Sequence, residues 1–237
     1  MRINIVRIVC LTLFLGGHSL CFAQIADSTY LDGIKAELQK KWPENRTINL
    51  VFHGHSVPAG YFATPDVRTL DAYPHQVLKR LKELYPYAVI NVITTAIGGE
   101  NSLQGVKRFK SDVLTHKPDV LFLDYALNDR GIGLEISKES MEVMINAALD
   151  ENIPVILMTP SPDMRVDIMT EGNELEQFSE MLAGLAATYK IGLADSFGQF
   201  KLQVVTGMDL KNYMSHVNHP NEKGHQLIAD EIIKYFK

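Results

Sequence analysis

The chain has 237 residues and a formal net charge of -5, with 46% hydrophobic and 22% charged residues, a balance typical of globular proteins. A chain of this length can bury a full core without metals or disulfides. Because acidic residues outnumber basic ones and no basic run occurs, nucleic acid and anionic membrane surfaces are excluded as favoured partners.

The first residues have the pattern of a secretory signal. Arg2 and Arg7 precede an apolar segment at residues 8–15, and Ala23 offers a small residue for cleavage. The apolar segment is too short to span a membrane. We therefore expect residues 1–23 to be a signal peptide and the protein to be periplasmic or secreted.

Both cysteines fall within this signal. A lipid anchor at Cys21 is disfavoured, because Leu20 is bulky where small residues are usual. Cleavage near Ala23 removes Cys10 and Cys21, so the mature chain relies on its core rather than on disulfides. Residues 24–237 show no repeat or linker and are expected to form a single domain.

Strand-like and helical patterns alternate along this domain. The apolar runs are nearly continuous, as in parallel strands that are covered on both faces. The pattern therefore predicts a three-layer α/β/α sandwich with a parallel five-stranded sheet. In chain order, the expected elements are a helix at 30–41, a strand at 48–52, a helix at 71–85, strands at 88–94 and 120–125, a helix at 137–149, a strand at 153–159, a helix at 173–189, a strand at 191–194 and a helix at 221–236.

Ser56 follows the first predicted strand, within Gly54-His55-Ser56-Val57. Open α/β sheets bind their ligands at the carboxyl ends of their strands. A hydroxyl in a turn of small residues at such an end is a candidate nucleophile, although a serine in a turn is also common for structural reasons alone.

Three further segments fall on the same predicted edge. Gly98-Gly99 forms a turn that opens a helix, Asn128 follows the third strand, and His219 stands just ahead of Pro220 at a helix start. Singly, these residues fit a tight turn, a helix cap and a surface histidine. Together with Ser56 they supply a nucleophile, a base and oxyanion donors for acyl transfer.

These segments resemble the four sequence blocks of the SGNH/GDSL hydrolases. The resemblance runs from about residue 48 to residue 225 and implies a flavodoxin-like sandwich. It also implies an enzyme that hydrolyses esters of lipids, acylated sugars and other small acyl compounds without a metal or cofactor. The blocks are Gly54-His55-Ser56-Val57, Gly98-Gly99-Glu100-Asn101, Leu127-Asn128-Asp129 and His219-Pro220-Asn221.

Carried over by position, the resemblance makes Ser56 the nucleophile and His219 the general base. The oxyanion hole would then consist of the backbone N–H groups of Ser56 and Gly99 and the side-chain amide of Asn128.

Two positions depart from the family pattern. His55 stands where the family usually has Asp before the serine, and His216 stands where it usually has the Asp of the triad. An imidazole cannot supply the fixed negative charge that orients the base. We therefore hypothesise a Ser56–His219 dyad, with the imidazole oriented by a backbone carbonyl or by another carboxylate, for which Asp209 is the nearest upstream acid.

A metal-dependent hydrolase is one alternative, because zinc sites use histidine ligands. His53 and His55 form one pair, and His216, His219 and His225 form a second group. We nevertheless expect no metal, since His53 and His55 share a side only if the strand continues through them, and His225 falls inside a helical pattern.

A non-catalytic glycan-binding module is the other alternative, favoured by the missing acid at position 216. For an enzyme, the preferred substrates are small acyl groups on polar molecules, above all O-acetyl groups on carbohydrate, and acyl transfer would use the same residues. The loops at 58–62 and 159–165 follow strand ends and are expected to shape the cleft. Arg130 and Arg165 fit solvated surface residues better than an anion site.

Overall fold

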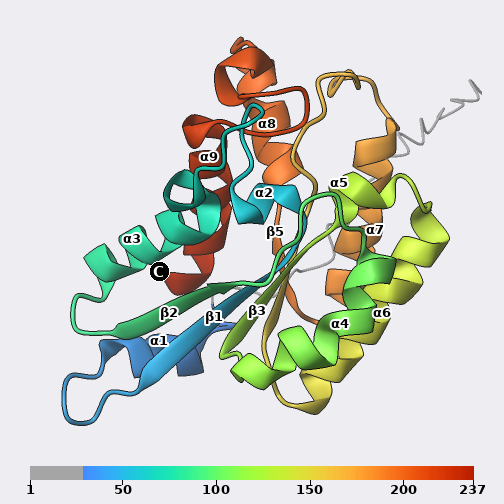
Figure 1. Ribbon diagram of the computed structural model, residues 1–237. Coiled ribbons are helices and arrows are strands. Elements are labelled where there is room, and N and C mark those ends of the chain that lie inside the picture. Colours follow the sequence, from blue (N-terminus) through green and yellow to red (C-terminus); the bar gives the residue numbers. More distant parts are fainter. Residues whose placement is uncertain (1–28) are drawn as a thin grey trace, which may run out of the picture.

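A computed structural model describes residues 29–237 of the chain, so the predicted signal peptide and its two cysteines lie outside the described residues. Five parallel strands form one sheet in the order β2-β1-β3-β4-β5 (Figure 1). This is the flavodoxin-like order, and the prediction of a parallel five-stranded α/β sandwich is confirmed. The strands are β1 (Thr47–Gly54), β2 (Val89–Thr94), β3 (Val120–Asp124), β4 (Val155–Met158) and β5 (Gly192–Ala194).

Helices cover both faces of the sheet. Figure 1 shows α3, α8 and α9 on one side and α4, α6 and α7 on the other. The longer helices are α1 (Asp32–Gln39), α3 (Tyr73–Leu84), α4 (Ser102–Asp112), α6 (Leu134–Asp150), α7 (Glu174–Tyr189), α8 (Ser196–Val205) and α9 (Glu222–Ile233). Short turns are α2 (Ser56–Ala59), α5 (Ala126–Asp129), η1 (Thr69–Asp71), η2 (Leu114–His116), η3 (Leu210–Tyr213) and η4 (Lys234–Phe236).

The apolar strands build two cores, one on each face. Leu50 and Phe52 of β1 pack toward α3 and α9, whereas Val51 between them packs with residues of α4 and α6. This alternation explains why β1 is apolar throughout. The edge strand β2 differs from the expectation of full cover, since Val89 is 47% exposed.

The strand order reverses between β1 and β3. From β1 the chain first adds β2 on one side and then crosses to place β3 on the other, with Gly54 aligned with Asp124. At such a switch point the loops leave the two strands in opposite directions and open a crevice. Ser56 follows β1 and Asn128 follows β3, so both lie at this position.

The close approach of β1 and β3 at Gly54 allows a test of the fold. A Cβ at this position would lie 2.4 Å from the Asp124 carbonyl oxygen. We expect Gly54→Ala to lower the free energy of unfolding by about 1–3 kcal/mol in urea denaturation, because strand backbones must move apart.

Gly184→Ala in α7 is the matched control, because a Cβ there has no neighbour within 4 Å. It should leave stability unchanged or raise it by up to about 1 kcal/mol. Equal urea midpoints for wild type and Gly54→Ala would contradict the close strand contact.

Candidate active site

Ser56 lies where the chain leaves β1. The strand ends at Gly54, His55 caps the short helix that follows, and Ser56 is the first residue of α2. The His55 Nδ1 accepts the N–H of Val57 at 3.2 Å and so helps to hold the turn. Ser56 is only 7% exposed. The backbone of this short, capped turn therefore holds the hydroxyl at the carboxyl end of β1.

His219 reaches Ser56 from near the other end of the chain. Its Nε2 lies 2.9 Å from the Ser56 Oγ. The turn that carries His219 is closed by the Ser215 hydroxyl, which donates to the carbonyls of His219 at 3.1 Å and Pro220 at 3.0 Å. The structure thus brings together the two residues that the sequence pairs as nucleophile and base.

The surroundings of His219 favour its neutral form. Burial lowers the pKa of the imidazole below its ordinary value of 6.5, and positive charge on His216 or His55 would lower it further. The Phe62 carbonyl acts in the opposite direction and favours the cation. The net lowering leaves His219 neutral near neutral pH, in the form that can accept a proton.

Within the described part of the chain, no carboxylate hydrogen-bonds to the Nδ1 side of this imidazole. Among residues 29–237, the buried Nδ1 of His219 has no aligned hydrogen-bond partner, and the Phe62 carbonyl is the backbone acceptor that acts on the ring. His216 is exposed, with its ring centroid 6.0 Å from that of His219. Asp209 is also exposed, and its carboxylate caps η3 by accepting the Lys211 N–H at 2.9 Å.

Two of the three predicted oxyanion donors, Gly99 and Asn128, belong to interlocked loops after β2 and β3. Gly99 has a φ of 79°, which favours glycine, and within the described part of the chain its N–H has no partner. Asn128 Nδ2 donates to the Glu100 carbonyl at 2.9 Å, and the Asp129 carboxylate accepts the Ser102 N–H at 2.7 Å. The loop after β2 is thereby fixed to the loop after β3, beside Ser56.

The match to a family model decides the family. The GDSL-like lipase/acylhydrolase model matches residues 52–227, which contain all of these side chains. The chain belongs to this family. It is accordingly a carboxylic-ester hydrolase. No curated protein matches the chain significantly.

Solved structures resemble the GDSL-like fold of this chain at low identity. A protein described as a GDSL-like lipase from Parabacteroides merdae has a TM-score of 0.69 at 16% identity, covering 80% of this chain and 95% of its own. Axe2, an acetylxylan esterase from Geobacillus stearothermophilus, has a TM-score of 0.67 at 19% identity, with 80% and 94% covered. A two-domain esterase active on acetylated mannans has a TM-score of 0.71 at 20% identity, with 90% and 54% covered.

A buried polar network supports the loop that follows β2 through Glu100. The Glu100 carboxylate accepts hydrogen bonds from Arg108, including one from Nε at 2.8 Å, and from the Tyr125 hydroxyl at 2.8 Å. His53 Nε2 lies 3.0 Å from that hydroxyl, and its Nδ1 lies 2.8 Å from the Thr95 Oγ1. Sequence reasoning missed these roles, because the spacing of the five residues carries no signal.

His55, one of the two departures from the family pattern, lies close to a carboxylate without an aligned hydrogen bond to it. Its Nε2 lies 3.3 Å from the Asp124 Oδ1, and both residues are almost fully buried. The other Asp124 oxygen accepts the Tyr73 hydroxyl at 2.9 Å. His55 therefore joins the Ser56 turn to the ends of β3 and α3.

Asp163 accounts for the two arginines that could have met an anionic substrate. This buried carboxylate lies 2.5 Å from Arg130 Nη2 and 2.6 Å from Arg165 Nη2, and the two guanidiniums hold its pKa well below the usual range. Arg130 also pairs with Glu174. The next residue, Met164, donates its N–H to the Val217 carbonyl at 2.8 Å. Arg130 therefore ties the β4 loop to the segment after α5, and the Met164 N–H joins that loop to the His219 turn.

The histidines do not assemble a metal site in the part of the chain that the structure describes. No three His, Cys, Asp or Glu side chains of residues 29–237 gather closely enough to hold a metal ion. His53 and His55 contact separate networks, and His225 Nδ1 accepts the Tyr73 N–H at 3.2 Å.

None of the helices in residues 29–237 has the length and apolar character needed to span a membrane.

The buried network predicts a pH-dependent stability. Burial, with the nearby Arg108 charge, lowers the pKa of His53 to about 4 from an ordinary 6.5. Between these values the unfolded chain binds a proton that the folded chain excludes, so the free energy of unfolding falls as the pH is lowered from about 6.5 to about 4.

His53→Gln should remove this contribution and make the decline shallower by up to about 1.4 kcal/mol per pH unit. Urea denaturation of both proteins across that range measures the slope, which is informative even if the variant is less stable overall. Parallel slopes would show that His53 is not held neutral.

Proposed function

We propose that this chain is a serine esterase that hydrolyses short-chain acyl esters, with O-acetyl groups on carbohydrate as its main substrate. The observation that carries the proposal is the 2.9 Å contact between the Ser56 Oγ and the Nε2 of His219. A hydroxyl bonded to a neutral imidazole is the arrangement required for nucleophilic acyl transfer.

The geometry supports a two-step mechanism. Neutral His219 takes the Ser56 proton as Oγ bonds to the ester carbonyl carbon. The protonated imidazole then gives this proton to the departing alcohol, leaving an acyl group on Ser56. Water then bonds to the acyl carbon as His219 takes one of its protons. The bond from Oγ to the acyl carbon breaks, the acid leaves, and the protonated imidazole returns the proton to the Ser56 Oγ. General-base assistance of this kind contributes about 10²–10⁴ in rate.

The charge that forms on the carbonyl oxygen needs fixed donors. We assign this role to the Gly99 N–H, the Ser56 N–H and the second hydrogen of the Asn128 amide, while the first amide hydrogen is donated to the Glu100 carbonyl. Each such donor is worth about 10²–10³ in turnover. The Phe62 carbonyl favours the cationic imidazole that forms during the reaction, without an aligned hydrogen bond to Nδ1.

Carbohydrate esters are proposed from the structural neighbours. Two of them are an acetylxylan esterase and an esterase active on acetylated mannans. Export of the protein is proposed as well, on the basis of the signal pattern in residues 1–23. The glycan-binding alternative keeps one observation in its favour: no carboxylate of residues 29–237 hydrogen-bonds to His219.

The test is steady-state kinetics on p-nitrophenyl acetate and acetylated xylo-oligosaccharides. Ser56→Ala and His219→Ala should each lower kcat/KM by at least about 10³-fold, because each removes one half of the reacting pair. Asp209→Asn is the matched control, and it should keep wild-type activity because Asp209 caps η3 instead of contacting His219.

Each contrary outcome has its own meaning. A loss in Asp209→Asn as large as that in His219→Ala would establish a triad through Asp209. Full activity of Ser56→Ala would remove the serine mechanism. Inactivity of the wild type on every ester would favour the glycan-binding module.

A further inference from the structure

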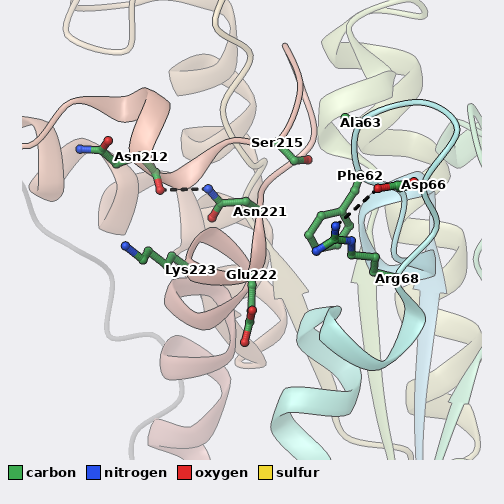
Figure 2. A pocket seen from close by; sticks show the side chains of 9 residues that line it. All are labelled: Phe62, Ala63, Asp66, Arg68, Asn212, Ser215, Asn221, Glu222 and Lys223. Atoms are coloured by element: carbon green, nitrogen blue, oxygen red, sulfur yellow. Dashed lines mark hydrogen bonds and ion pairs between the residues drawn. The ribbon is translucent and has the colours of Figure 1, made fainter.

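A cavity of about 330 Å³ lies beside the segments that flank His219, and neither Ser56 nor His219 lines it. Figure 2 shows it between the loop that follows α2 and the segment leading into α9. Its lining residues are Phe62, Ala63, Asp66, Arg68, Asn212, Ser215, Asn221, Glu222 and Lys223. The volume is at the lower end of the range for small-molecule sites, about 300–1,000 Å³.

Two segments that line the cavity also contact the His219 turn or ring. Ser215 holds the turn of His219 through the carbonyls of His219 and Pro220. On the opposite wall, Phe62 is the residue whose carbonyl acts on the His219 ring. A ligand in this cavity would therefore contact both segments that set the position of the imidazole.

The lining side chains retain unused hydrogen-bonding capacity. Among the described residues, the Asn212 amide, the Glu222 carboxylate and the Lys223 ammonium make no hydrogen bond or ion pair. The Asn221 amide, in contrast, is occupied, since it donates to the Asn212 carbonyl at 2.9 Å. Donors and acceptors together suit hydroxyl groups, each of which both donates and accepts.

The charges of the lining cancel. Asp66 and Glu222 oppose Arg68 and Lys223, and the Arg68 guanidinium lies over the Phe62 ring, 5.3 Å from its centroid. A site without net charge favours neither an anion nor a cation. A neutral ligand rich in hydroxyl groups matches both the charge balance and the free donors and acceptors.

We infer that this cavity is a carbohydrate subsite that holds a neutral sugar unit of the substrate beyond the one that bears the ester. The inference rests on the proposed function, in that the ester is the one attacked by Ser56. The subsite gives the protein a preference for acylated oligosaccharides over small aryl esters that cannot reach the cavity.

The experiment compares acetylated xylo-oligosaccharides with p-nitrophenyl acetate in the double variant Asn212→Ala/Lys223→Ala. The ratio of kcat/KM for the oligosaccharide to that for the aryl ester should fall about tenfold, the loss expected for two hydrogen bonds to a neutral ligand. Lys138→Ala/Asn146→Ala on α6, on the other face of the sheet, is the matched control and should keep the wild-type ratio.

An unchanged ratio in Asn212→Ala/Lys223→Ala, with wild-type activity on both substrates, would overturn the subsite. Failure of the esterase proposal is distinguished by calorimetry with unacetylated xylohexaose on Ser56→Ala protein. If this protein binds xylohexaose, and adding the cavity substitutions weakens binding, the subsite stands even if no ester is hydrolysed. If it does not bind, or if the substitutions have no effect on binding, the subsite is wrong whatever the esterase activity.

Discussion

The hydrogen bond between Ser56 and His219 joins two segments that are 163 residues apart, and the structure around it fixes its two ends. On the serine side, the close pairing of β1 with β3 places the turn, and His55 ties it to Asp124. On the histidine side, Ser215 closes the turn and the β4 loop packs against it through Met164. Since the hydroxyl and the imidazole must stay within about 3 Å to exchange a proton, these supports are conditions for the chemistry.

The region around the base has imidazoles where the family usually has carboxylates. A carboxylate would stabilise the cationic base, whereas burial and neighbouring imidazoles lower the pKa of His219 and favour the neutral ring. With imidazoles in place of carboxylates, His219 stays neutral and able to accept a proton at lower pH, but its cationic form is stabilised less in the transition state. The dipole of the Phe62 carbonyl partly stabilises the cation. Phe62 belongs to the loop after α2, which also lines the cavity of about 330 Å³.

The sequence was sufficient for the sheet and for the four site blocks, because both follow from local patterns. Apolar runs located every strand within a few residues, strand ends located Ser56 and Asn128, and the proline at the start of the last helix located His219. Helix α8 was missed, since Gly198 and a β-branched end make it a weak helix former that its packing with α9 stabilises. The networks of Glu100 and Asp124 were missed because they join residues with no shared spacing. The group that orients His219 depends on how the loops before α9 fold in space, which the sequence pattern does not predict. The same loops place Asp209 at the start of η3.

In the proposed mechanism, a neutral His219 activates Ser56 without a carboxylate. The rate of covalent labelling by a fluorophosphonate, followed by mass spectrometry across pH, reports the protonation state of this base. We expect one label per chain, on Ser56, with a rate that rises with pH through a midpoint below 6.5, the ordinary histidine value. The label should be absent in Ser56→Ala and in His219→Ala. Labelling of another residue, or a midpoint above 6.5 as a paired carboxylate would produce, would rule out this mechanism.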